Sequence, residues 1–142
     1  MIENLIKILN IHFSKNLNND IIINFVQQFQ YIPIDCKNNN IYQLQTYHKT
    51  LLYRCDNFEI YQINWSKSSS TLLHRHPKNG CILKVISGKL QESIYNNISI
   101  KNNIHIKNNV SYIDDNIGMH TITALEDSIS LHIYSPPKFY EQ

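Results

Sequence analysis

Two histidines separated by one residue, His74 and His76, are the part of the sequence with the most chemical content. On a β-strand, side chains two residues apart point to the same face, so both imidazoles can reach one metal ion. Imidazole is a suitable ligand for iron, zinc, copper and nickel. A third ligand is needed, and His120, which follows Gly118 and Met119, is the best candidate. The pattern predicts a metal centre, although two such histidines can also be ordinary surface or core residues.

The residues after this pair follow a regular spacing: four residues, then Cys81, then six residues, then Gly88. This is similar to the general cupin signature, in which H-x-H is followed at the same spacing by Glu and then Gly. Cys81 takes the place of the Glu, which removes an anionic ligand and leaves three neutral imidazoles. An Fe(II) ion in such a site keeps its positive charge and favours an anionic, electron-rich substrate such as a thiolate.

The chain also resembles the cysteine dioxygenase family of thiol dioxygenases, in order from about Tyr47 to Pro137. The matching segments are Tyr47-His48-Lys49, Phe58-Glu59-Ile60 with Trp65, His74-Arg75-His76 with Cys81, Leu83-Lys84-Val85 to Gly88-Lys89-Leu90, Tyr112-Ile113-Asp114-Asp115 with Ile117-Gly118-Met119-His120, and Ser130-Leu131-His132-Ile133-Tyr134-Ser135-Pro136-Pro137. The block that ends in Ser-Pro-Pro is specific, whereas H-x-H alone is not.

The resemblance implies a set of roles for residues of this chain. It places the iron ligands at His74, His76 and His120, and a thioether cross-link between Cys81 and Tyr134. An isolated cysteine is more commonly a small buried hydrophobic residue, and this alternative stays open for Cys81.

Three residues near the end of the match, Ser130, His132 and Tyr134, lie at i, i+2 and i+4, so one strand face can carry all of them. The resemblance implies that they form a hydrogen-bonded relay that holds the tyrosine hydroxyl near the metal. The alternative is an ordinary alternating strand with one half-buried face.

The sequence departs from the family at Lys49. The family pattern is Tyr-x-Arg, in which the arginine pairs with the substrate carboxylate, and here the pair is Tyr47 and Lys49. A lysine ammonium can neutralise a carboxylate but cannot form the two-pronged contact of a guanidinium. The departure leaves the identity of the substrate open, and Arg54 is an alternative carboxylate ligand.

The apolar pattern predicts how these residues are positioned. Residues 1 to about 30 have helical spacing, with a second helix from Asp20, as N-cap, to Phe29. Residues 42–137 carry strand signals: Phe58–Trp65 largely alternates, Ser130–Tyr134 alternates, residues 81–86 form a more continuous apolar run, and residues 98–106 suggest short strands with Asn turns. With the resemblance, this predicts an all-β cupin (double-stranded β-helix, or jelly-roll) barrel with N-terminal α-helices, as one domain over residues 1–142.

Composition narrows the class of protein further. The chain has 142 residues and a net charge of +2 without a basic cluster, so binding to nucleic acid is not expected. No run of 18 apolar residues occurs, so no membrane span is expected. Three cysteines and the lack of a signal-peptide pattern indicate a reducing compartment, and we expect a cytoplasmic monomer.

The resemblance implies an Fe(II)-dependent enzyme that oxidises L-cysteine to cysteine sulfinate with O2. In this interpretation Tyr134 orients the substrate or oxygen, and Tyr47 and Lys49 hold the carboxylate. Two alternatives remain. One is a dioxygenase of another small thiol such as 3-mercaptopropionate. The other is a cupin that binds a metal or small molecule without catalysis.

Overall fold

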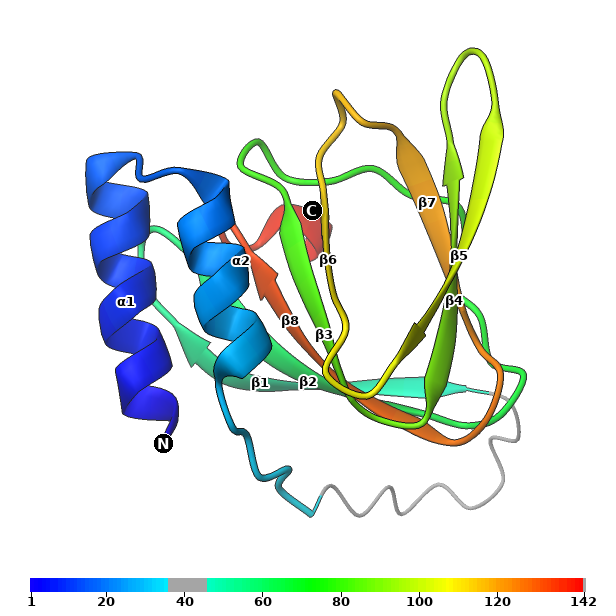
Figure 1. Ribbon diagram of the computed structural model, residues 1–142, viewed down its shortest axis with the longest axis horizontal. Coiled ribbons are helices and arrows are strands. Elements are labelled where there is room, and N and C mark those ends of the chain that lie inside the picture. The colour runs from blue at the N-terminus through cyan, green and yellow to red at the C-terminus, as the bar shows by residue number, and fades with distance from the viewer. Residues whose placement is uncertain (36–45, 142) are drawn as a thin grey trace.

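The computed structural model describes residues 1–35 and 46–141, and it begins with two helices. Helix α1 spans Ile2–Lys15 and helix α2 spans Asn19–Gln28, and the two lie side by side next to the strands (Figure 1). The N-cap of α2 is Asn18, whose side chain accepts a hydrogen bond from the backbone N–H of Asp20. The predicted cap at Asp20 was therefore wrong by two residues, because the asparagine oxygen already satisfies that N–H group.

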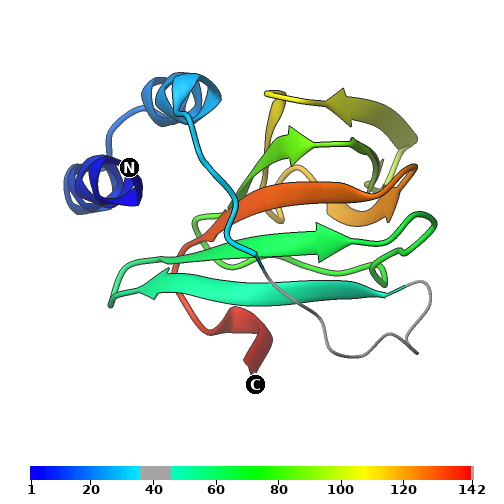
Figure 2. The same cartoon turned by 90° about the horizontal axis from the view of Figure 1, so that it is seen from below.

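Eight strands follow and form two antiparallel sheets. The strands are β1 Tyr47–Arg54, β2 Glu59–Trp65, β3 Cys81–Ser87, β4 Lys89–Tyr95, β5 Ile100–Ile106, β6 Val110–Ile113, β7 Met119–Ala124 and β8 Ser128–Tyr134. Their order is β1-β2-β8-β3-β6 in one sheet and β5-β4-β7 in the other. Figure 2 shows the two helices set to one side of the strands. The chain ends in a short 3-10 turn, η1, at Phe139–Glu141.

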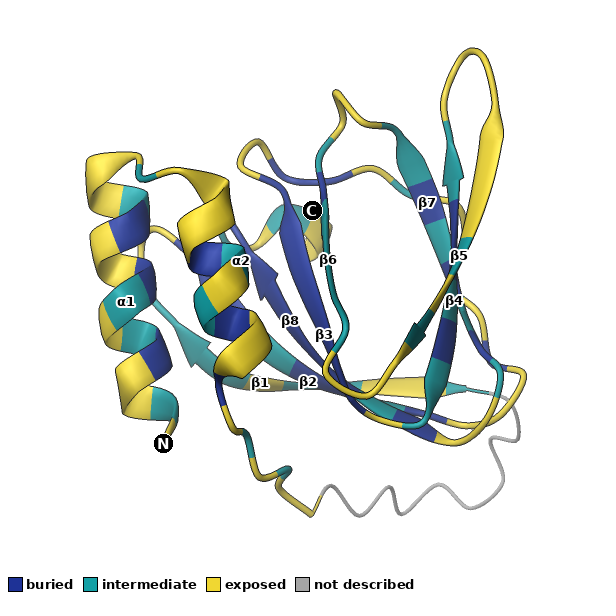
Figure 3. Ribbon diagram, in the orientation of Figure 1, coloured by how far each residue is buried: buried dark blue, intermediate teal, exposed yellow. Residues whose placement is uncertain are grey.

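The five-stranded sheet is covered on both faces, which explains why its central strands are so apolar. On one face Ile82 and Leu131 pack with the buried helix residues Leu5 and Val26. Residues that alternate with these along the same strands, such as Leu83, point to the other face and pack inside the barrel with residues of the second sheet. Figure 3 shows β3 and β8 buried along nearly their whole length, while the outer faces of the helices are exposed. A continuous apolar run is the expected pattern for such a strand.

Helix α2 is fixed to the sheet by a buried lysine. Lys84, on β3, is 1% exposed and its ammonium donates hydrogen bonds to the carbonyls of Val26, Gln27 and Phe29. These carbonyls lie at the C-terminal end of α2, where backbone acceptors lack partners within the helix. The lysine therefore serves as a C-terminal cap supplied by the barrel.

The region around residues 98–106 differs from its prediction. It forms one strand, β5, and Asn102 and Asn103 lie inside it, paired with Ser93 and Glu92 of β4. The two asparagines had been predicted as a turn. The Ser93 hydroxyl contacts the side-chain oxygen of Asn102 at 2.6 Å, and backbone pairing with β4 prevails over the weak strand preference of asparagine.

Some sequence features fall where the structure gives no description. The predicted start of the barrel at Tyr42, the Asn38–Asn40 run and Cys36 all lie outside the described residues. Among the described residues, no helix is long and apolar enough to cross a membrane.

Candidate metal centre

The two histidines of the H-x-H motif lie outside the regular strands. Both belong to the connection between β2 and β3, where His74 forms an isolated bridge with His120 of β7. The backbones of these two residues exchange hydrogen bonds of 3.1 and 3.3 Å. No regular strand forms at His74–His76, because Pro77 follows and because the N–H of His76 donates to the side chain of Asp115. The strand placement was therefore wrong, although the connection still directs both rings to one point.

The structure brings the three predicted histidines together. The ring centres of His74, His76 and His120 are 4.4–5.4 Å apart, and one ligand nitrogen from each lies within 4.8 Å of the others. Among the described residues this is the one group of three or more histidine, cysteine or acidic side chains that can hold a metal ion.

The hydrogen bonds of two rings fix which nitrogen is available. The Nδ1 of His74 contacts the carbonyl of Leu72 at 2.7 Å, and the Nδ1 of His120 contacts the carboxylate of Glu92 at 2.7 Å. Both partners are acceptors, so in the neutral rings both Nδ1 atoms carry the proton and both Nε2 atoms present lone pairs. Those two Nε2 atoms are 2.9 Å apart. Two lone pairs at this separation repel each other unless a cation lies between them.

His76 adds a third unsatisfied group. It is 2% exposed, and among the described residues its Nε2 has no hydrogen-bond partner, while its Nδ1 lies 3.4 Å from the carboxylate of Asp115 without forming a hydrogen bond. Burial is the main cause that lowers the pKa of His74 and of His76 to about 4, and the neighbouring His120 ring lowers both further. The rings are therefore neutral at ordinary pH, which is the form that binds a metal. The residues present fit a divalent transition-metal ion.

Glu92, on β4, is a site residue that the sequence analysis missed. It is 1% exposed, and its carboxylate contacts His120, His105 and the hydroxyl of Ser111. Burial opposes its ionisation, but these hydrogen bonds outweigh burial and hold the pKa of Glu92 well below its usual range. The available signal was a carboxylate at the inward parity of β4, between Leu90 and Ile94. His105 is half-buried, and it contacts this carboxylate through its Nε2.

The predicted relay residues lie in series along β8. Ser130 contacts Nε2 of His132 at 2.7 Å, and Nδ1 of His132 contacts the hydroxyl of Tyr134 at 3.3 Å. Trp65 extends the series, because its indole N–H donates to the Ser130 hydroxyl at 2.8 Å. Burial lowers the pKa of His132 and raises the pKa of Tyr134, so both side chains are neutral.

Cys81 lies directly across from Tyr134 in the pairing of β3 with β8. Both are buried in one small cluster, and the sulfur is 3.9 Å from Nδ1 of His132. Burial raises the pKa of the Cys81 thiol far above its usual value. The residue is therefore a protonated thiol beside the tyrosine, outside the group of three metal-binding histidines.

A cavity of about 350 Å³ opens beside the histidines. Its lining is Tyr47, Lys49, Ile63, Trp65, Thr71, Leu72, His74, His120, Ile122, His132, Tyr134 and Tyr140. This volume suits a small molecule. It brings two of the three histidines, the His132 and Tyr134 members of the relay, and the predicted carboxylate-binding pair to one space.

Lys49 enters this cavity between aromatic rings. Its ammonium lies 4.5 Å from the ring centre of Tyr61, 4.9 Å from that of Tyr134 and 5.0 Å from that of Tyr140. Among the described residues it has no hydrogen bond or ion pair, and burial lowers its pKa. Tyr47 packs on Trp65 with ring centres 4.9 Å apart. The cavity therefore contains one cation that is held by ring faces and lacks an anionic partner.

Comparison with known proteins identifies the family of this chain. The family described as cysteine dioxygenase type I matches residues 1–141. The chain belongs to the cysteine dioxygenase type I family. It is 27% identical to cysteine dioxygenase type 1 of Danio rerio over 96% of this chain and 75% of that protein. It is 28% identical to the protein of that name in Homo sapiens over 56% of this chain, where the match spans only 46% of the relative.

Solved structures agree on the fold. An RmlC-like cupin from Shewanella frigidimarina aligns with a TM-score of 0.57 at 13% identity, over 69% of this chain and 83% of that one. A cupin superfamily protein from Desulfitobacterium hafniense aligns with a TM-score of 0.58 at 11% identity, over 75% and 93%. At these identities the likeness shows the fold alone. The predicted cupin fold with N-terminal helices is thereby confirmed.

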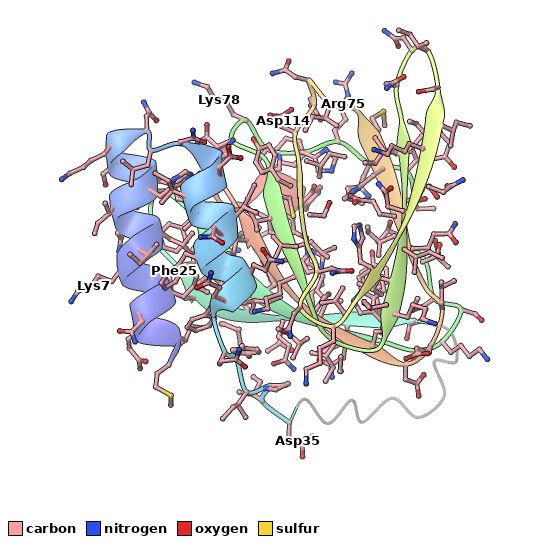
Figure 4. The ribbon with its side chains drawn as sticks, viewed as in Figure 1. Lys7, Phe25, Asp35, Arg75, Lys78 and Asp114 are labelled. Atoms are coloured by element: carbon pink, nitrogen blue, oxygen red, sulfur yellow. The ribbon has the colours of Figure 1, made fainter. Side chains whose placement is uncertain are left out.

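Neither arginine of this cysteine dioxygenase family member lines the cavity. Arg54 contacts Glu141, Glu59 and the hydroxyl of Tyr61, and the hydrogen bonds to Glu141 and Glu59 raise its pKa. Arg75 is exposed, and Figure 4 shows its side chain pointing outward at the edge of the barrel. Lys49 is therefore the one lysine or arginine among the lining residues of the cavity.

Proposed function

We propose that this chain is an iron-dependent thiol dioxygenase that oxidises L-cysteine to cysteine sulfinate with O2. The observation that carries the proposal is the convergence of the three histidine nitrogens, two of them with opposed lone pairs, on a small cavity that also contains Lys49. Membership in the cysteine dioxygenase type I family supports the same reaction.

The ligand set favours a ferrous ion and an anionic substrate. Three neutral imidazoles leave the charge of a divalent ion uncompensated, so a thiolate gains from binding there. When bound, iron supplies the redox chemistry and lowers the pKa of the thiol. The reaction balances without another reductant: both atoms of O2 pass to sulfur, which loses four electrons as O2 gains four.

Lys49 and Tyr47 hold the carboxylate of the substrate in this proposal. A cation held by ring faces at 4.5–5.0 Å has its hydrogen-bond donors free for an incoming anion. Tyr134, which the relay through His132 keeps neutral and oriented, presents its hydroxyl to the same cavity.

We also propose a thioether cross-link between Cys81 and a ring carbon of Tyr134. The two residues are direct partners across β3 and β8 and pack in one cluster. Forming the bond removes one hydrogen from the sulfur and one from the ring, and O2 accepts the two electrons. Intact mass measurement after turnover tests this: a loss of two hydrogens in the parent is expected, with no loss in Cys81→Ser. An unchanged parent mass contradicts the proposal.

A second thiol, 3-mercaptopropionate, remains a candidate because Lys49 replaces the arginine of the family pattern. It carries the thiol and the carboxylate but lacks the amine of cysteine. The proposal further takes the chain as a single cytoplasmic domain that acts as a monomer.

Oxygen uptake with a thiol panel tests the proposed function. The protein is loaded anaerobically with Fe(II) and assayed with cysteine, 3-mercaptopropionate and cysteamine. Uptake should be fastest with cysteine, with sulfinate formed in equal amount to the O2 consumed. A preference for 3-mercaptopropionate would make that thiol the substrate in place of cysteine. Absence of uptake with every thiol would favour the alternative of a cupin that binds a metal or small molecule without catalysis.

A further inference from the structure

The carboxylate of Glu92 contacts Nδ1 of His120, the ring nitrogen that does not face His74, and Glu92 is not among the residues that line the cavity. We propose that Glu92 is a positioning residue that holds His120 in its metal-binding tautomer, and that His105 and Ser111 hold Glu92 in place. This inference rests on the ligand role of His120 in the proposed function.

The two tautomers of His120 have opposite consequences for a metal. With the proton on Nδ1, the ring donates to Glu92 at 2.7 Å and its Nε2 lone pair is available. With the proton on Nε2, the ring donates instead to the Nε2 of His74 at 2.9 Å. In that second state two of the three ligands bind each other, and neither lone pair faces a metal.

Glu92 decides between these two states. A carboxylate only accepts hydrogen bonds when it is ionised, so it stabilises the first tautomer and disfavours the second. The negative charge of Glu92 also makes the His120 imidazole a stronger metal ligand. Without Glu92, the contact between the two histidines would close the site in the absence of a metal.

The carboxylate is itself held by two further donors. The Nε2 of His105 contacts it at 3.0 Å and the hydroxyl of Ser111 donates to it at 2.6 Å. These residues come from β5 and β6, and Glu92 comes from β4, so three strands fix one carboxylate. The other two ligands are held less firmly: the Nδ1 of His74 contacts a single backbone carbonyl, and the Nδ1 of His76 lies 3.4 Å from the carboxylate of Asp115, which is exposed. His120 is therefore the ligand that the barrel orients most firmly.

Metal affinity, measured without turnover, tests the proposal. Co(II) is titrated into the full chain in competition with a chromogenic chelator, for the parent, Glu92→Gln and Glu92→Leu. We expect the dissociation constant to rise about tenfold in Glu92→Gln, which keeps an acceptor, and about a hundredfold in Glu92→Leu. His105→Leu and Ser111→Ala, which loosen the carboxylate, should give smaller increases.

Glu59→Gln is the matched control, because Glu59 is also 1% exposed but contacts Arg54 and the backbone of Lys138 instead of a histidine. Its metal affinity should equal that of the parent. Nitrogen NMR of the metal-free protein gives a second readout that general destabilisation does not produce. The His120 proton should lie on Nδ1 in the parent and move to Nε2 in Glu92→Leu.

Equal affinity in the parent and both Glu92 variants, or an unchanged tautomer, would overturn the inference. The result is independent of thiol oxidation. A chain that binds Co(II) tightly but oxidises no thiol removes the proposed function and leaves the role of Glu92 intact.

Discussion

Two lysines of the five-stranded sheet, Lys84 and Lys49, have opposite surroundings. Lys84 faces the helices, and its ammonium donates to three backbone carbonyls of the α2 terminus. Lys49 faces the cavity, and among the described residues its ammonium contacts the faces of three tyrosine rings and forms no hydrogen bond. The same side chain is thus a structural link on one face of the sheet and an unpaired cation on the other.

The difference indicates which polar groups lack a partner in the protein and are therefore available to a ligand. Buried polar groups normally have partners, and those that lack them need an explanation. The same condition recurs in His76, whose Nε2 has no hydrogen-bond partner among the described residues, and in the opposed lone pairs of His74 and His120. A metal ion would bind one nitrogen of each histidine, and an anionic substrate would pair with the ammonium of Lys49.

The largest expected effect comes from removing a metal ligand. His120→Ala should lower bound iron from about one ion per chain to a trace and abolish thiol oxidation, because two imidazoles do not retain the ion. Metal analysis of protein loaded with Fe(II) measures this, with the exposed His48→Ala as control. Stoichiometric iron in His120→Ala would remove this residue from the ligand set.

Replacing the two lysines in turn should give opposite results. Lys84→Met removes charged hydrogen bonds, each worth about 1.5–3 kcal/mol, so Tm should fall by roughly 5 °C or more while KM for cysteine is unchanged. Lys49→Met removes a cation without hydrogen bonds, so Tm should change little. Its KM for cysteine should rise about tenfold to a hundredfold.

Substrate comparison sharpens the role of Lys49. Lys49→Arg should lower KM for cysteine, because a guanidinium binds a carboxylate with two hydrogen bonds. Cysteamine has no carboxylate, so its KM should stay constant across the parent, Lys49→Arg and Lys49→Met. If all three proteins handle cysteine alike, Lys49 does not bind the carboxylate.

The smallest expected effect concerns His12, on the helix side. This residue is 6% exposed, and burial lowers its pKa below 6.5. The folded state therefore binds this proton less readily than the unfolded state. Its contribution to stability is complete above about pH 6.5 and is lost as the pH falls below that value.

Thermal unfolding of the metal-free protein between pH 7.5 and 5 tests this. The decrease in Tm on acidification should be smaller in His12→Leu than in the parent, and unchanged in His48→Gln. An equal decrease in the parent and His12→Leu would show that His12 does not titrate on unfolding.

Spacing and periodicity predicted the parts of the molecule in which local pattern determines position. The strands that contain Cys81 and Tyr134 follow from apolar runs, and the structure aligns those two residues because β3 and β8 pair in that register. The placement of His74 and His76 outside a strand did not follow, because it depends on pairing with His120, 46 residues away. Glu92 and Tyr140 reach the site only through the closure of the two sheets and the C-terminal turn.

The most direct test of the account is the fate of isotopically labelled O2. The protein with one equivalent of Fe(II) is mixed with cysteine under labelled O2, and the product is analysed by mass spectrometry. The account predicts cysteine sulfinate with both oxygen atoms labelled, formed by the parent and absent with His120→Ala. Recovery of unreacted cysteine or of the disulfide alone, with iron bound at about one ion per chain, would contradict it.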